Sequence, residues 1–198
     1  MDPSEPMEGI WLVSYIVLWL VVLVLLVLVI LLYRQLGIMY LGSAEGVSRD
    51  GLDLGAQAPD FALTDQYGNL QRPADYRGRP LLLLFGSPNC GPCKVLLPEL
   101  HAWASDHPHV GVLWLNLASR EENLRYAKEM GATLPMPAHT PADGVVEHFK
   151  VRVTPFLFFL DEQGIVRAKG LANSREALDL YYNRLRSSRE GLAVQQVG

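Results

Sequence analysis

Cysteine is scarce in this sequence: only Cys90 and Cys93 occur among 198 residues. A structural zinc site needs four ligands, and no second cysteine pair is present to supply them. His107 and His109 are separated by one residue, whereas a finger-like histidine pair is separated by about three to five. This scarcity argues against zinc. Cysteines that serve only as small hydrophobes have no reason to share one helical turn, so a redox pair is the favoured interpretation.

Charge is absent from residues 10–32, IWLVSYIVLWLVVLVLLVLVILL, a run of 23 residues. At about 1.5 Å per helical residue the run extends roughly 34 Å, which is enough to cross a bilayer. Basic side chains are also absent before it, and the run exceeds the roughly 7 to 15 apolar residues of a signal peptide. The sequence therefore predicts a membrane anchor, with Trp11, Tyr15 and Tyr33 at the interfaces.

An excess of basic residues is also lacking, because the formal net charge is −4. This charge gives no reason to expect nucleic-acid binding. The composition changes along the chain predict five segments. They are an N-terminal tail at 1–9, a transmembrane anchor at 10–33, a juxtamembrane linker at 34–54, one soluble domain at 55–187 and a C-terminal tail at 188–198.

Three short apolar runs in the soluble part indicate buried central strands: LLLLF at 81–85, GVLWLNL at 111–117 and FLFFL at 156–160. Residues 161–164, Asp-Glu-Gln-Gly, predict a tight turn that joins the third run to IVRAK in a hairpin.

Helices are predicted between and after these strands. Ser119 and Glu122 form a capping box, and a later helix is expected to start at Asn173 with Glu176 at its third position. The expected apolar face of the first of these helices consists of Leu124, Ala127 and Met130. Alternating strands and helices of this kind indicate an α/β fold, in which helices cover both faces of a sheet.

The cysteine pair directly follows the 81–85 strand and opens a helix with the sequence KVLLPELHAWA. Unpaired backbone N–H groups and the positive end of the helix dipole stabilise a thiolate at this position. Cys90 is therefore the expected exposed nucleophile. Cys93, one turn later, can close a disulfide and should be the more shielded, resolving thiol.

A peroxidase is one alternative, because GAQAPDFALTDQYGN at 55–69 resembles the opening hairpin of peroxiredoxins and of membrane-anchored thioredoxin-like proteins. Peroxiredoxins carry Pro-x-x-x-Thr/Ser-x-x-Cys at the reactive cysteine. Ser87 matches this pattern, but Leu83 occupies the proline position. The peroxidase interpretation is therefore weaker than a dithiol pair.

The segment CGPCKVLLPEL resembles the active-site helix of thioredoxin, with Pro98 at the position of its kinking proline. Thr154-Pro155 ahead of FLFFLDEQG resembles the cis-proline loop of that family. The resemblance implies a thioredoxin-like fold, a central mixed sheet with flanking helices and an N-terminal β-hairpin. It also implies that Cys90 attacks, Cys93 resolves and Pro155 is a cis-proline opposite the disulfide. The implied substrate-binding residues are Thr154, Gly91 and Pro92.

Over residues 10–186 the chain is similar to the MauD group of the membrane-anchored thioredoxin-like (TlpA/ResA/redoxin) family, whose members assist methylamine dehydrogenase maturation. This resemblance implies a thiol-disulfide oxidoreductase without a cofactor. The implied clients are cysteine-containing exported proteins, such as the small subunit of methylamine dehydrogenase, and the implied electron partner is a membrane or periplasmic dithiol protein.

The same resemblance implies a single-pass protein of the cell membrane, in contact with lipid, whose domain lies on the periplasmic side. Arg34 and Arg49 beyond the span weakly favour the opposite orientation. A tethered redox domain is most useful where disulfides form and persist, so we expect the periplasmic, extracytoplasmic side.

Three departures from the family concern redox tuning. MauD proteins usually carry Cys-Pro-x-Cys, whereas Gly91-Pro92 is the dipeptide of thioredoxin. Leu84 and Leu96 stand where thioredoxin and the ResA-like reductases keep an acid, so the sequence identifies no general base. The Gly-Pro dipeptide suggests a potential nearer to thioredoxin's, about −270 mV, than to DsbA's, about −120 mV. A reductase or isomerase is therefore favoured over a primary oxidant.

A copper carrier is the second class of hypothesis. Sco-like proteins resemble the same domain but place three residues between their cysteines, whereas two residues separate Cys90 from Cys93. In this alternative His139, within the proline-rich stretch LPMPAHTPADG, is the expected third ligand.

Overall fold

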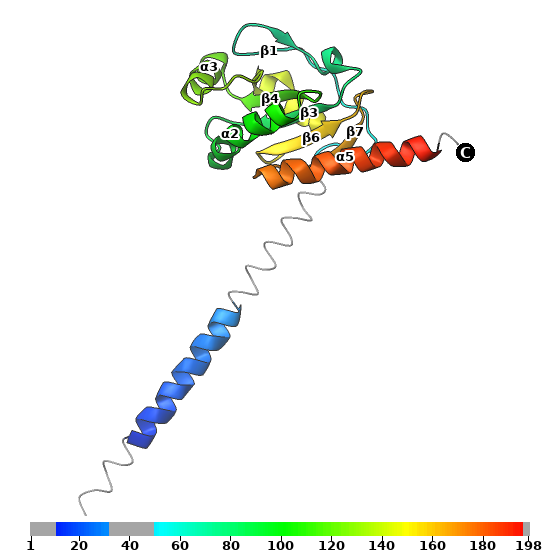
Figure 1. The fold of residues 1–198 in the computed structure, drawn as a ribbon. Coiled ribbons are helices and arrows are strands. Elements are labelled where there is room, and N and C mark those ends of the chain that lie inside the picture. Colours follow the sequence, from blue (N-terminus) through cyan, green and yellow to red (C-terminus); the bar gives the residue numbers. More distant parts are fainter. Residues whose placement is uncertain (1–10, 32–49, 196–198) are drawn as a thin grey trace, which may run out of the picture. The chain divides into compact units, whose positions relative to one another are not determined.

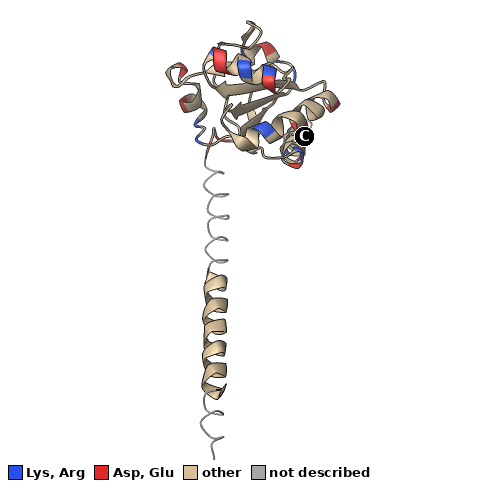
Figure 2. Cartoon of the chain, turned by 90° about the vertical axis from the view of Figure 1, so that its left-hand side faces the viewer, with Lys and Arg blue, Asp and Glu red and all other residues tan. Residues whose placement is uncertain are grey.

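The computed structural model describes residues 11–31 and 50–195, and the chain divides into two compact units, residues 1–46 and 47–198 (Figure 1). In the first unit the described residues form one helix, Trp11–Leu31, with a mean hydropathy of 3.2 and no buried residues. By length and composition this helix can cross a membrane. Figure 2 shows it without a charged residue, whereas charges of both signs are spread over the second unit.

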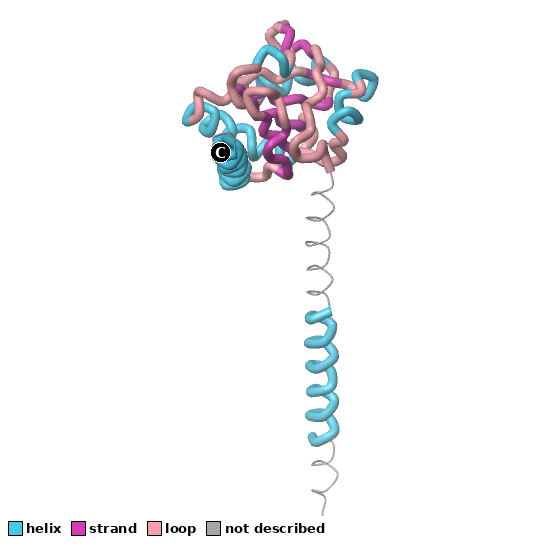
Figure 3. The backbone as a smooth tube through the Cα atoms, turned by 90° about the vertical axis from the view of Figure 1, so that its right-hand side faces the viewer, coloured by secondary structure: helices cyan, strands magenta, loops and turns pink. Residues whose placement is uncertain are grey.

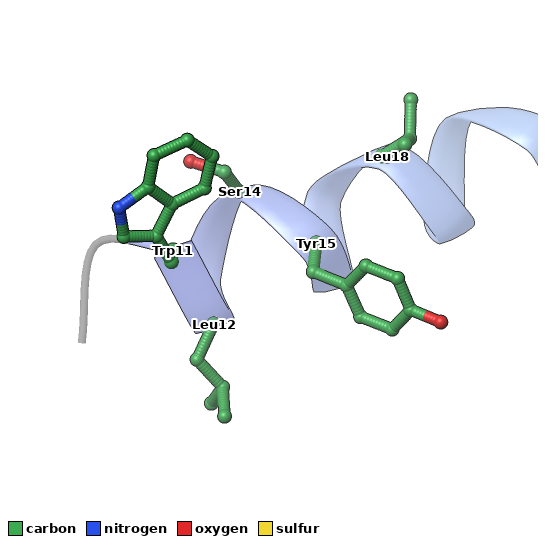
Figure 4. A pocket seen from close by; sticks show the side chains of 5 residues that line it. All are labelled: Trp11, Leu12, Ser14, Tyr15 and Leu18. Carbon is green, nitrogen blue, oxygen red and sulfur yellow. The ribbon is translucent and has the colours of Figure 1, made fainter. Parts of the chain in front are cut away.

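Aromatic residues occupy the first turns of this helix. Trp11 and Tyr15 lie one turn apart near its start (Figure 4), and the rings of Tyr15 and Trp19 meet edge-on with centroids 6.2 Å apart. Such rings are typical of a membrane–water interface. The third expected interface residue, Tyr33, lies outside the described residues, as do the predicted tail at 1–9 and most of the predicted linker.

The second unit is built on a five-stranded mixed sheet in the order β5-β4-β3-β6-β7. β3, β4 and β5 are parallel, whereas β6 is antiparallel to β3 and β7 is antiparallel to β6. The strands are β3 Leu81–Gly86, β4 Gly111–Leu117, β5 Ala138–His139, β6 Phe156–Leu160 and β7 Val166–Leu171. The three predicted apolar strands and the β6–β7 hairpin are therefore confirmed.

The remaining elements surround this sheet, and Figure 3 shows the strands passing between helices. A small antiparallel hairpin, β1 with β2, precedes it, as the family resemblance implied. The bounds are β1 Leu63–Thr64, β2 Leu70–Gln71, α2 Gly91–Asp106, α3 Arg120–Glu129, α4 Val145–Phe149 and α5 Arg175–Gln195, with single 3-10 turns at Pro73–Tyr76 and Pro141–Asp143. The architecture is the expected thioredoxin-like α/β fold.

Two apolar cores lie on opposite faces of the sheet, because alternate residues of a strand point to opposite sides. Leu82 and Leu84 of β3 pack with α2, α3 and α5, whereas Leu81, Leu83 and Phe85 pack with α4 and the segment before β1. All five side chains are buried, which explains why β3 is apolar throughout.

The second unit, residues 47–198, corresponds to the predicted soluble domain, and we call it the soluble unit. Its boundaries differ from those predicted for that domain. Leu52 is buried, the Gly51 amide donates to the Lys150 carbonyl at 2.9 Å, and Lys169 Nζ donates to the Asp50 carbonyl at 2.9 Å. Residues 50–54 thus belong to the packed unit and not to a linker. At the other end α5 continues to Gln195, so most of the expected tail at 188–198 is helical.

Helix α5 spans Arg175–Gln195 and is capped one residue later than predicted, by Ser174 instead of Asn173. The Ser174 hydroxyl accepts a hydrogen bond from the Ala177 amide at 3.4 Å, which is the usual geometry of a capping serine.

Helix α3 has the predicted capping box but a different buried face. Ser119 Oγ accepts from the Glu122 amide at 3.3 Å, and Glu122 Oε2 accepts from the Ser119 amide at 3.0 Å. Leu124, expected in the core, is 37% exposed. The buried residues are Asn123, Tyr126 and Ala127. The face is rotated because Asn123 donates to the Met136 carbonyl and accepts from Asn116, and these bonds draw an amide into the core.

Candidate active site

The two cysteines form a disulfide at the start of α2, with their Cα atoms 5.2 Å apart. Cys90 caps the helix: its Sγ accepts a hydrogen bond from the Cys93 amide at 3.2 Å. Cys93 is fully buried (0% exposed), whereas Cys90 is half-buried and Gly91 and Pro92 between them are exposed. The pair therefore presents only one of its sulfur atoms to solvent.

The turn that leads into α2 depends on a close approach at the end of β3. A Cβ atom at Gly86 would lie 2.5 Å from the indole nitrogen of Trp114, so only glycine fits beside that ring. Pro92 stands in the first turn of α2, where no intrahelical amide bond is required of it. These two residues let the chain pass from a buried strand to an exposed helix start within a few positions.

The Thr154–Pro155 peptide bond is cis and leads directly into β6. Because Phe156 is paired with Phe85 of β3, Pro155 lies beside the end of β3, at the sheet edge from which the chain continues to Cys90. Pro155 is buried and its carbonyl accepts from the Ala172 amide at 3.1 Å, while Thr154 is exposed. The fold thus brings the cysteine pair and Pro155, far apart in sequence, to one edge.

The positions at which relatives carry an acid hold buried leucines here. Leu84 and Leu96 are both fully buried in the core cluster that contains Cys93. Asn89, at the position of thioredoxin's tryptophan, is exposed. The surroundings of Cys93 at these two positions are therefore apolar.

A chain of buried polar groups at the site was not recognised in the sequence. Trp114 Nε1 donates to Asn116 Oδ1 at 2.7 Å, and Asn116 Nδ2 donates to Asn123 Oδ1 at 2.7 Å. Asn123 Nδ2 then donates to the Met136 carbonyl at 2.5 Å. The available signal was the single asparagine within the otherwise apolar run GVLWLNL. This chain fixes the active-site end of β4 to α3.

His139, the expected copper ligand, lies on the other face of the sheet from Cys93. It is 1% exposed, and its ring meets Phe85 edge-on at 6.1 Å, in the core cluster opposite that of Cys93. Its Nδ1 has no hydrogen-bond partner among the described residues. Within residues 11–31 and 50–195, no group of three His, Cys, Asp or Glu side chains is arranged to hold a metal ion.

Burial lowers the pKa of His139 below its ordinary 6.5, and the nearby Asp143 and Glu147 offset this only in part. Between the lowered folded pKa and 6.5, the unfolded chain binds more protons than the folded one. Stability that is fully present above about pH 6.5 is therefore lost as the pH falls toward the folded pKa.

Replacing His139 with Gln should reduce this part of the pH dependence without abolishing it, because burial also lowers the pKa of His101, which remains. The measurement is urea unfolding of the full chain in detergent between about pH 7.5 and pH 5. The exposed His148→Gln serves as a control and should follow the wild-type curve. If His139→Gln follows that curve too, the proton uptake on unfolding occurs elsewhere.

The chain is similar in sequence and in fold to several known proteins. The family model described as the AhpC/TSA family matches residues 54–169. The methylamine utilization protein MauD of Paracoccus denitrificans is 32% identical over 197 residues, which cover 96% of this chain and 94% of that protein. This similarity extends beyond the soluble unit.

Two further similarities cover a smaller part of the chain. The thiol-disulfide oxidoreductase ResA of Geobacillus kaustophilus is 32% identical over 117 residues, covering 58% of this chain and 67% of that protein. Among solved structures, a putative thiol:disulfide interchange protein DsbE from Chlorobium tepidum superposes with a TM-score of 0.62 at 24% identity. It covers 68% of this chain and 99% of that one, and supports the fold.

Proposed function

Because the chain belongs to the AhpC/TSA family and is a MauD-like thiol-disulfide oxidoreductase of thioredoxin fold, we propose that Cys90 and Cys93 are its redox pair and that helix Trp11–Leu31 anchors it in a membrane. The observation that carries the proposal is the unequal exposure of a disulfide-bonded pair at a helix start. Another protein can reach the sulfur of Cys90, whereas the buried sulfur of Cys93 can react only with Cys90.

In the reductive direction the reaction proceeds in two exchanges. The Cys90 thiolate attacks one sulfur of a client disulfide, which forms a mixed disulfide and releases the other client sulfur as a thiolate. Cys93 then attacks Cys90 Sγ, which closes the internal disulfide and releases the second client sulfur as a thiolate. The proton of the Cys93 thiol passes to one of the released client thiolates. The client gains two electrons and the protein loses two.

The surroundings of the pair support these roles. The helix N-terminus favours the thiolate of Cys90 through its free amide groups, and the Cys93 amide already points at Cys90 Sγ. Buried leucines around Cys93 disfavour a charged thiolate before the mixed disulfide forms. The exposed residues Gly91, Pro92 and Thr154 are proposed to form the surface on which a client segment binds, next to the buried Pro155 that precedes β6.

A peroxidase mechanism finds no support at the corresponding loop. The residue that would be the peroxiredoxin proline, Leu83, is fully buried inside β3 and pairs with strands on both sides. A proline there would interrupt the middle of the sheet. Membership of the AhpC/TSA family therefore does not carry a peroxidatic site into this chain.

The proposed clients are cysteine-containing exported proteins, and the small subunit of methylamine dehydrogenase is the first candidate. The support is the similarity to the methylamine utilization protein MauD over nearly the whole chain. A membrane or periplasmic dithiol protein is proposed to reduce the Cys90–Cys93 disulfide afterwards. Reduction or isomerisation of client disulfides is the proposed direction.

The soluble unit is proposed to face the periplasm, which is testable with a thiol reagent that cannot cross membranes. After mild reduction of intact cells whose outer membrane has been made permeable, a charged maleimide should label Cys90. Cys90→Ser should remove most of the label, because the remaining thiol is fully buried. Labelling that requires lysis of the inner membrane would place the domain in the cytoplasm.

A further inference from the structure

A polar pocket of about 220 Å³ adjoins the active-site helix between α2 and α3, and we call it the α3 pocket. Three of its lining residues flank the cysteine pair: Pro88 and Asn89 precede Cys90, and Lys94 follows Cys93. The others belong to the end of β4 and to α3. They are Leu117, Ala118, Glu122, Arg125, Tyr126 and Glu129.

The sheet order places this pocket on one side of Cys90 and Pro155 on the other. β3 lies between β4 and β6, Cys90 follows β3, the pocket lies where β4 ends, and Pro155 precedes β6. Neighbouring strands are about 4.8 Å apart. An extended chain advances about 3.3–3.6 Å per residue. When an extended client segment binds across Cys90, the client residue one or two positions away from the reacting cysteine therefore places its side chain at the pocket.

The charges around the pocket are balanced but separated. Lys94 projects from α2, whereas α3 contributes Arg125 flanked by Glu122 and Glu129 at three and four residues, a spacing that makes them neighbours on a helix. The α2 wall thus carries one positive charge and the α3 wall a net charge of −1. Among the residues with described side chains, Lys94, Arg125 and Glu129 take part in no ion pair within 4 Å.

Tyr126 contributes a second, independent feature. The residue is 3% exposed, and its hydroxyl has no hydrogen-bond partner in the described part of the chain. Burial raises its pKa above the ordinary 10.0, so the hydroxyl keeps its proton and stays a donor. A buried donor without an acceptor is costly, and Tyr126 lines the pocket, so a ligand acceptor that reached its hydroxyl would relieve that cost.

We propose that the α3 pocket is a specificity subsite for the client side chain one or two positions from the reacting cysteine, and that it prefers the carboxamide of Gln or Asn. The proposal rests on the proposed function of Cys90. A carboxamide accepts through its oxygen, from Lys94 and Tyr126, and donates through its amino group, to Glu129. A client side chain with a net charge is attracted by one wall of the pocket and repelled by the other.

The test uses the reduced full chain in detergent and oxidised peptide dimers, each joined through a single cysteine. The residue one or two positions from that cysteine is Gln, Glu, Lys or Leu. Oxidation of the Cys90–Cys93 pair is followed by thiol alkylation, and each rate is divided by that of the same dimer with dithiothreitol. The Gln dimer should react about tenfold faster than the Leu dimer, a difference of about 1.4 kcal/mol.

Charge variants should change the order of preference. Lys94→Met leaves the pocket net negative and should favour the Lys dimer, whereas Glu129→Gln leaves it net positive and should favour the Glu dimer. The matched controls Lys128→Met and Glu121→Gln remove the same charges from exposed positions of α3 outside the pocket and should keep the wild-type order. Tyr126→Phe should slow the Gln dimer several-fold, and Tyr181→Phe should not.

The outcomes separate this inference from the proposed function. Equal corrected rates for all four dimers, or an order that Lys94→Met and Glu129→Gln leave unchanged, would mean that the pocket holds only water and would overturn the inference alone. If no dimer oxidises the reduced protein, or if Cys90→Ser is oxidised as fast as the wild type, the proposed function falls and the subsite falls with it.

Discussion

Replacing Cys93 with Ser is expected to turn the protein into a trap that accumulates disulfide-linked complexes with its clients in the cell. Cys90 remains half-exposed at the start of α2 and can still attack. The thiol that would release the mixed disulfide is gone, and a serine hydroxyl cannot replace it at neutral pH. The complexes should be seen on a non-reducing gel and should collapse on reduction.

The matched control is Cys90→Ser, which should trap far less because the remaining Cys93 is fully buried. Mass spectrometry of the trapped bands identifies the client. If Cys93→Ser captures nothing while the wild type cycles between redox states, Cys90 is not the atom that meets the client. If it captures proteins unrelated to methylamine dehydrogenase, the exchange mechanism stands and the proposed client falls.

Replacing Asn123 with Leu is expected to lower the free energy of unfolding by about 2–6 kcal/mol. Asn123 is the link between Asn116 and the Met136 carbonyl, at 2.7 and 2.5 Å, and both partners lie in the buried interior. Without it, the Asn116 amino group and the Met136 carbonyl each lose a partner, at about 1–3 kcal/mol apiece. Urea unfolding of the full chain in detergent measures the loss.

The double variant Asn116→Leu, Asn123→Leu should be more stable than the sum of the two single losses predicts, because the two side chains satisfy each other. The exposed Asn183→Leu is the control and should change stability by no more than about 0.5 kcal/mol. A loss below about 1 kcal/mol for Asn123→Leu would show that the amide is readily replaced by apolar packing.

The strands and the cysteine helix could be predicted from the sequence because local signals and tertiary packing agree there. Residues 81–85 and 156–160 are wholly apolar, and the structure covers both faces of β3 and β6. The same agreement holds at Ser119, where the capping box begins α3. At these positions the sequence pattern is compatible with only one secondary structure.

Predictions failed where the structure depends on partners distant in sequence. The buried face of α3 is set by Asn116 and Met136, which no helical periodicity within α3 reveals. β5 is two residues long, too short for an alternation to show, and it exists only because it pairs with the end of β4. Residues 50–54 look like a linker, but Lys150 and Lys169 hold their backbone against the sheet.

The α3 pocket could not be foreseen for the same reason. Its walls come from residues 88–94, from the end of β4 and from α3, which are brought together only by the parallel pairing of β3 with β4. Pro155 was more accessible to prediction, since one motif resemblance sufficed to single it out. Its position beside β3 follows from the register of Phe156 with Phe85.

In the proposed function, the full burial of Cys93 beside a half-buried Cys90 leaves a single sulfur atom at which redox partners can react. A donor that reduces the disulfide and a client that consumes the dithiol must both bond to the same sulfur atom. They cannot be bound there together, so each visits in turn and leaves before the other arrives, in a ping-pong sequence. Because the donor reacts with the disulfide form and the client with the dithiol form, adding more of one partner stops raising the flow of electrons once the other becomes limiting.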